Sequence, residues 1–213
     1  MSSRKDPEPE KPKTSFSRRG FMRGVGLGGG ALGTGILEKE ASAQAPASKV
    51  LGPGPVPITL QINGKPYKLN VEPRVTLVDA LRNYLDFTSA KRSCNRGTCG
   101  ACTVIMGGKA VDACSVLAID AQGKEIQTLE GLSAGSRPHP IVSSISRNDA
   151  VQCGYCTPGF VMAAKAFIDR HPNPTAEQVM QGLGGNVCRC GTYVPMRKAL
   201  VEAAREMKGG RNA

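Results

Sequence analysis

Residues 91–102 read KRSCNRGTCGAC and space Cys94, Cys99 and Cys102 as Cys-x4-Cys-x2-Cys, and Cys114 follows after eleven intervening residues. This is the plant-type spacing of a [2Fe–2S] cluster, in which two irons and two bridging sulfides are held by four thiolates. The thiolates must point inward around a small ionic core. These four cysteines therefore predict a first [2Fe–2S] site.

Strand patterns precede this cysteine stretch. Residues 58–62 and 67–71 alternate apolar and polar side chains, and the Asn63-Gly64 pair between them is a strong hairpin signal. Thr76 can cap a helix whose apolar positions recur at helical spacing. A hairpin followed by a helix predicts the opening of a β-grasp fold.

The cysteine stretch also carries turn signals. Gly97 and Gly100 allow the sharp backbone turns that wrapping a cluster requires. A further hairpin is expected from residues 103–106 and 109–112, and it would bring Cys114 back to the other three cysteines. Two more strands are expected to complete the sheet, at residues 116–119 and 125–128.

The second half of the chain has a helical pattern and a different cysteine set. Cys153, Cys156, Cys188 and Cys190 follow the spacing Cys-x2-Cys-x31-Cys-x-Cys. Four helices around two cysteine loops predict a bundle with one metal centre held between helix ends. The helices are expected at residues 140–146, from 159 to about 171, from a capping box at 175 and 178, and at 195–207.

Three interpretations compete for the eight cysteines. Four disulfides are the usual expectation for an exported chain, but a chain of this length can bury a sufficient core without them. Zinc favours isolated sites built from Cys-x2–4-Cys pairs. Two [2Fe–2S] clusters use all eight cysteines, and this is the favoured interpretation. A Rieske centre needs two histidine ligands, whereas His139 and His171 lack cysteine-paired spacing and are expected to flank helices or lie at the surface.

The N-terminus has the three parts of an export signal. Residues 17–23 read SRRGFMR, residues 24–37 carry no charge and are half glycine, and residues 41–43 form an Ala-Ser-Ala cleavage site. The paired arginines resemble a twin-arginine signal, the route for proteins exported already folded. The chain is therefore expected in the periplasm. This route suits clusters that are assembled in the cytoplasm.

The expected organisation is an α+β chain. A β-grasp ferredoxin domain of the plant type is followed by a four-helix-bundle [2Fe–2S] domain. The predicted segments are a twin-arginine signal peptide over 1–43, a linker over 44–56, the ferredoxin-like domain over 57–134 and the helical domain over 135–213.

Charge and composition exclude some classes of partner. The net charge of the chain is +11, and residues 44–213 keep 20 basic and 12 acidic residues. The absence of Trp and the few other aromatics argue against a base-stacking nucleic-acid binder. No apolar run reaches the roughly 20 residues of a membrane span. The excess of basic residues favours a solvated surface or an acidic protein partner.

On these motifs the chain resembles the iron–sulfur subunit of the molybdenum hydroxylases, the xanthine oxidase family. The resemblance rests on the cysteine stretch at 94–114, on QCGYCTPG at 152–159 and on GNVCRCG at 185–191, and it spans about residues 57–208. With its leader, the chain is most similar to small subunits of periplasmic aldehyde oxidoreductases. CRCGTY at 188–193 also resembles isoquinoline-oxidoreductase-type small subunits.

The resemblance implies a function in electron transfer, with no catalytic residue in this chain. A large partner subunit would hold molybdopterin and hydroxylate a substrate carbon with oxygen from water. The cluster on Cys153, Cys156, Cys188 and Cys190 is expected beside the pterin, with Gln152 and Cys190 in contact with it. The cluster on the other four cysteines is expected further out and passes electrons to a subunit with FAD or to a cytochrome c with haem.

Two departures from the family and two rival functions remain. Ser93 stands where the family often has Gly, and the segment at 139–142 lacks a Gln that often follows nearby. One rival is a free-standing exported ferredoxin-like carrier. The other is a binding protein that is stabilised by disulfide bonds.

Overall fold

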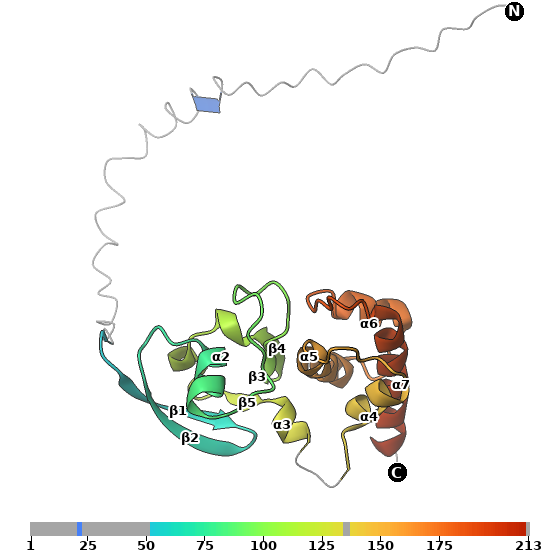
Figure 1. Ribbon diagram of the computed structural model, residues 1–213, viewed down its shortest axis with the longest axis horizontal. Coiled ribbons are helices and arrows are strands. Elements are labelled where there is room, and N and C mark those ends of the chain that lie inside the picture. The colour runs from blue at the N-terminus through green and yellow to red at the C-terminus, as the bar shows by residue number, and fades with distance from the viewer. Residues whose placement is uncertain (1–20, 23–51, 134–136, 212–213) are drawn as a thin grey trace, which may run out of the picture. The chain divides into compact units, whose positions relative to one another are not determined.

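The computed structural model describes residues 21–22, 52–133 and 137–211 (Figure 1). The Arg18-Arg19 pair, the expected cleavage site at Ala43 and most of the expected linker lie outside these residues. The described residues from 52 onward belong to one compact unit that contains all eight cysteines. Among the described helices, none combines the length and the apolar character needed to cross a membrane.

The first half is built on a five-stranded mixed sheet. β1 (Val56–Ile62) and β2 (Lys65–Val71) form an antiparallel hairpin, and β5 (Glu125–Gln127) lies parallel to β1 on its other side. β3 (Thr103–Met106) and β4 (Lys109–Asp112) form a second hairpin, which gives the order β2-β1-β5-β3-β4. The central parallel pair agrees with the predicted β-grasp fold.

Both predicted hairpins turn at residues with left-handed backbone. Asn63 and Gly64 have φ angles of 51° and 75°, and Gly107 and Gly108 have φ angles of 55° and 75°. Asn63 also ties its turn to the end of β5. Its Nδ2 donates to Thr128 Oγ1 at 3.0 Å, and its Oδ1 accepts from Thr128 N at 2.9 Å.

A short helix covers the sheet, as predicted. The Thr76 hydroxyl caps it by accepting from the backbone N–H of Asp79 at 3.3 Å. α2 (Leu77–Asp79) then continues as a π-helical turn, η1 (Ala80–Tyr84), so the helix is wider here than its 3.6-residue pattern predicted. Its apolar positions are fully buried in the core: Leu77, Val78 and Leu81.

The prediction of a strand at 116–119 is wrong. Two 3₁₀ turns, η2 (Ala113–Ser115) and η3 (Ala118–Ala121), flank a single antiparallel bridge between Leu117 and Thr76. Ala118 and Ala121 are both fully buried, and their three-residue separation places them on the same side of a 3₁₀ turn. In a strand, by contrast, these two side chains would point to opposite faces.

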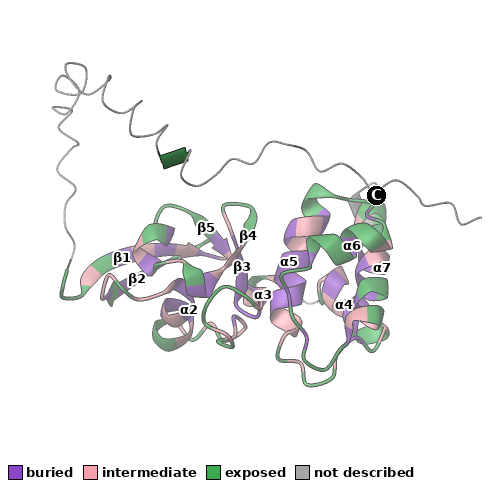
Figure 2. Cartoon of the chain, turned by 90° about the horizontal axis from the view of Figure 1, so that it is seen from above, coloured by how far each residue is buried: buried purple, intermediate pink, exposed green. Residues whose placement is uncertain are grey.

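The second half is helical, and α5 joins it to the sheet. One set of α5 side chains packs among the helices, including Phe160, Val161 and Ile168. On its other side, Met162 and Ala166 pack with Ile105 of β3. Figure 2 shows the resulting buried stripes along α5 and along the strands. The short α3 (Leu129–Leu132) follows β5, and the helices of the second half are α4 (Pro140–Arg147), α5 (Thr157–Arg170), α6 (Ala176–Gly182) and α7 (Tyr193–Arg211).

Candidate iron–sulfur sites

The first cysteine set (Cys94, Cys99, Cys102 and Cys114) comes from one loop and from the turn after the second hairpin. Cys94 and Cys99 lie in the loop before β3, Cys102 directly precedes β3, and Cys114 lies in η2 after β4. The second hairpin therefore brings Cys114 back to the other three cysteines, as predicted.

The thiols of the first set stand in two pairs. The Cys99 thiol helps to lower the pKa of Cys94, and the Cys114 thiol acts on the pKa of Cys102. Hydrogen bonds from the Thr98 side chain and then from the backbone of Arg96 lower the pKa of Cys94 to about 6. Burial raises the pKa of the Cys102 thiol to about 12.

Backbone N–H groups of the same loop point at these sulfurs. Gly97 N donates to Cys114 Sγ at 3.2 Å, and Thr98 N donates to Cys94 Sγ at 3.4 Å. Gly97 has a φ of +68°, a left-handed conformation that glycine adopts without strain. N–H groups aimed at sulfur stabilise thiolate charge and tune the potential of a bound cluster.

The second cysteine set (Cys153, Cys156, Cys188 and Cys190) comes from two helix ends far apart in sequence. Cys153 and Cys156 directly precede α5, whereas Cys188 and Cys190 lie in the loop between α6 and α7. Cys153 contacts Cys190, and Cys156 contacts Cys188. The packing of α5 against α6 and α7 thus brings these four thiols together.

Hydrogen bonds to Thr192 and Tyr193 position Cys188. Its Sγ lies 3.2 Å from Thr192 Oγ1, and its backbone N–H donates to the Tyr193 hydroxyl at 2.8 Å. Burial raises the pKa of Cys188, but the bonds to Thr192 outweigh it and bring the pKa to about 7. Burial, followed by the Cys188 contact, raises the pKa of Cys156 to about 12.

The paired thiols have the chemistry of binuclear iron sites. A mononuclear zinc site gathers four ligands around one point, whereas each iron of a [2Fe–2S] cluster takes two thiolates besides its two bridging sulfides. All eight cysteines are free thiols, so none of the four pairs is a disulfide. Both sets therefore suit a [2Fe–2S] cluster.

The two cysteine loops are bonded to each other directly. Val187 N, next to Cys188, donates to the carbonyl of Cys99 at 2.9 Å. The buried Asn186 side chain donates to the carbonyl of Gly100 at 3.0 Å. The backbone beside one set therefore touches the backbone beside the other.

The tight packing of α5 against the first cysteine loop depends on Gly159, for which the sequence predicted no contact. A Cβ on this first-turn residue of α5 would collide with the carbonyl of Gly100 and come within 3.1 Å of Ala101 Cα. Asn186 was also missed as a functional residue. The only signal for either was its position inside the QCGYCTPG or GNVCRCG motif.

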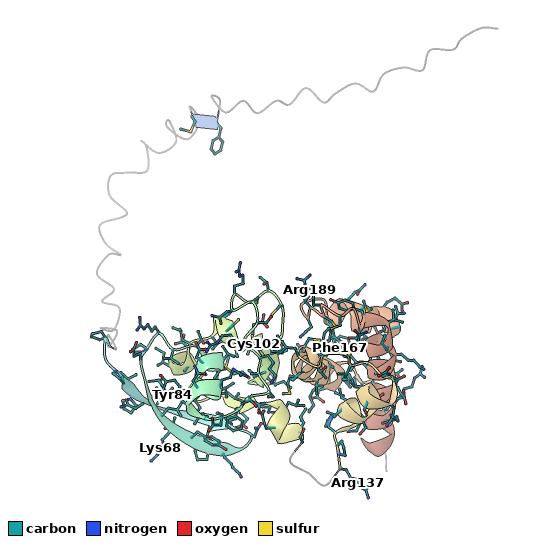
Figure 3. All side chains as sticks on the ribbon, viewed as in Figure 1. Lys68, Tyr84, Cys102, Arg137, Phe167 and Arg189 are labelled. Atoms are coloured by element: carbon teal, nitrogen blue, oxygen red, sulfur yellow. The ribbon has the colours of Figure 1, made fainter. Side chains whose placement is uncertain are left out.

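A hollow of about 450 Å³ lies between the two sets. Cys94 and Cys99 line it from one side, and Cys153 and Cys156 from the other. Its other lining residues include one charged side chain, that of Arg189. Figure 3 shows Arg189 on the loop before α7 and Cys102 at the start of β3.

Gln152 and Cys190 were predicted to contact a pterin, and both are exposed. Gln152 directly precedes Cys153, which contacts Cys190, so the two lie at one edge of the second set. The histidines lie elsewhere: His139 is the N-cap of α4 and His171 the C-cap of α5. This agrees with their predicted helix-flanking positions.

Two family models match the part of the chain that carries the cysteines. Residues 60–130 match a 2Fe-2S iron-sulfur cluster binding domain, and residues 128–201 match a [2Fe-2S] binding domain. The chain is thus an iron–sulfur protein with two domains of this class.

Relatives define the family more closely. The aldehyde oxidoreductase iron-sulfur-binding subunit PaoA of Escherichia coli is 38% identical over 81% of this chain and 80% of that protein. The nicotinate dehydrogenase small FeS subunit of Eubacterium barkeri is 41% identical over 68% of this chain and 92% of that protein. The chain belongs to the iron–sulfur small subunits of the molybdenum hydroxylase family.

Solved structures agree. Quinoline 2-oxidoreductase from Pseudomonas putida 86 superposes with a TM-score of 0.70 and 37% identity, covering 73% of this chain and 98% of the matched one. The aldehyde oxidoreductase of Desulfovibrio desulfuricans has a TM-score of 0.69 and 41% identity. There the match covers 72% of this chain but 17% of the longer one. The chain is therefore an electron-transfer subunit of an oxidoreductase of this type.

Proposed function

We propose that this chain serves a periplasmic molybdenum-containing oxidoreductase that acts on aldehydes or N-heterocycles. Its second cysteine set takes electrons from a molybdopterin-binding subunit. Its first set passes them to a flavin subunit or a cytochrome c. The substrate classes are those in the names of its relatives, which include aldehyde oxidoreductase and nicotinate dehydrogenase subunits.

The observation that carries this proposal is the pairing of all eight thiols in two sets whose loops are bonded together. Each set would hold one [2Fe–2S] cluster, which when bound supplies a centre that accepts and returns one electron. The chain's own residues hold the thiols in pairs and aim N–H groups at the sulfurs. They also keep the two loops in contact through Val187 and Asn186.

Exposure distinguishes the two edges of the second set. Cys156 is half-buried and Cys188 buried, but Cys153 and Cys190 are exposed, as is the neighbouring Gln152. In the proposal this open edge faces the pterin of the partner. A free-standing carrier, the alternative function, would leave two ligand sulfurs of one cluster open to solvent.

Anaerobic purification of the chain with its genetic neighbours tests the proposal. We expect about four irons per chain, since each of two clusters holds two. We also expect a large molybdenum-containing chain to co-purify. Iron content near zero would contradict the cluster assignment, whereas four irons in a stable monomer without a molybdenum partner would favour the lone carrier.

The periplasmic location rests on the leader sequence. Replacing Arg18 and Arg19 by lysine should retain the chain in the cytoplasm with its iron bound, because twin-arginine export acts on folded protein. Cell fractionation measures this. Unchanged export of the double variant would contradict the twin-arginine assignment.

A further inference from the structure

An apolar pocket of about 310 Å³ lies between α6 and α7, beside the second cysteine set. Its lining includes Val179 of α6, Leu183 at the C-cap of α6, and Met196 and Leu200 of α7. The Tyr193 ring also lines it, while the Tyr193 hydroxyl accepts from Cys188 N at 2.8 Å. Tyr193 therefore lies between a molecule bound in this pocket and the backbone of Cys188, a predicted cluster ligand.

Exposed apolar side chains gather around this pocket and the second set. Among the described residues between 52 and 211, six large hydrophobic side chains are exposed. Two of them, Met180 and Val187, line the pocket, and Val187 also lines the hollow between the cysteine sets together with Tyr155. Exposed apolar residues that cluster in this way mark an interaction site, whereas scattered single ones do not.

The border of the pocket is cationic. Arg197 lines both the pocket and an adjoining groove, which Lys198 and Arg205 also line. The one acid in that groove, Glu202, is bonded to Arg147 at 3.1 Å and to Asn148 at 2.7 Å. Within the described residues none of the three cations forms an ion pair. An apolar centre with a charged rim is typical of a protein–protein interface.

We propose that the α6–α7 pocket anchors a segment of the molybdopterin-binding subunit that inserts an apolar side chain and carries acidic residues beside it. The inference rests on the proposed function and adds the anchoring point. The cations on α7 favour an acidic segment. Val187 lines both this pocket and the hollow that Cys153 lines, so the pocket adjoins the part of the second set that faces the molybdopterin-binding subunit in the proposed function. The anchor then fixes the open edge of the second set against its electron donor.

Binding of the iron-loaded chain to the purified large subunit tests the anchor. Met180→Glu places a charge on the pocket wall, and Arg197→Glu reverses the rim. Each should weaken binding by about tenfold or more, which is about 1.4 kcal/mol. Leu117→Glu and Lys68→Glu are matched controls on exposed positions of the sheet half, and both should bind within about twofold of wild type. EPR spectra of both clusters check that each variant is loaded.

The outcomes separate the alternatives. Loaded Met180 and Arg197 variants that bind normally would overturn the anchor while leaving the proposed function intact. Equal losses in the two controls would also overturn it. Self-association that Met180→Glu abolishes, with large-subunit binding retained, would assign the pocket to a second copy of the chain. A wild-type chain that does not bind the large subunit would overturn the proposed function and the anchor together. If Met180→Glu fails to fold, Arg197→Glu decides alone, because that side chain is exposed.

Discussion

The two cysteine sets differ in how the chain assembles them. The first set comes from one loop and a returning hairpin, so its four cysteines span only residues 94–114. The second set comes from the ends of helices that are more than thirty residues apart, and it forms only when α5, α6 and α7 pack. Cys102 and Cys114 of the first set are buried, whereas Cys153 and Cys190 of the second are exposed. No thiol of the first set is fully exposed, whereas the second set has two exposed thiols at an edge that is open to a partner.

The largest effect is expected from Cys114→Ser. It removes one ligand of the first set, so iron should fall from about four to about two per chain. The second cluster should survive, because its thiols belong to other elements. Iron analysis and EPR of the anaerobic protein measure this. Loss of both EPR signals together would show that the two sites are not independent.

Gly159→Ala breaks the contact between the two regions. Alanine ordinarily favours a helix over glycine by about 1 kcal/mol, yet here its Cβ meets the carbonyl of Gly100. Backbone cannot yield as a flexible side chain can, so we expect a loss of about 1–3 kcal/mol in the free energy of unfolding. Denaturant unfolding of the loaded protein measures it.

The matched control is Gly185→Ala in the second cysteine loop. A Cβ there meets nothing within 4 Å, and the substitution should change stability little. If the Gly159 variant were as stable as this control, the close approach of α5 to the first cysteine loop would not contribute to the free energy of unfolding.

Asn186→Ala removes the side-chain bond between the loops. The carbonyl of Gly100 keeps its bond from the Thr103 hydroxyl at 2.7 Å, so the loss should be about 1 kcal/mol, less than for Gly159→Ala. Hydrogen exchange at Val187 N, which bonds Cys99, should become faster because the neighbouring bond is gone. Unchanged exchange there would mean that Asn186 does not hold the loops together.

The sequence predicted the first region more completely than the second. Spacing and turn residues within residues 58–114 identified two hairpins and the return of Cys114, because those contacts are local. The prediction of a strand at 116–119 was wrong because Ala118 and Ala121 are both buried, which a 3₁₀ turn allows and the alternating faces of a strand do not. The contacts of Gly159 and Asn186 with the first loop depend on tertiary packing, which periodicity does not encode.

The smallest effect is expected from Arg189→Gln. Arg189 is the one charged residue that lines the hollow between the sets, and a positive charge stabilises the reduced, more negative state of a nearby cluster. Neutralising it should move both reduction potentials to more negative values. The side chain is exposed and therefore screened, so each shift should stay below the ~59 mV of a tenfold change in a one-electron equilibrium. Redox titration followed by EPR resolves the two clusters.

Arg96→Gln provides the comparison, because Arg96 lies in the first loop and its Nε donates to the carbonyl of Cys94 at 3.4 Å. It should shift the first cluster alone, and Arg189→Lys should restore both potentials toward wild type. If Arg189→Gln moved one potential only, the hollow would not couple the two sites electrostatically. Their connection would then reside in the hydrogen bonds made by the Val187 backbone and the Asn186 side chain.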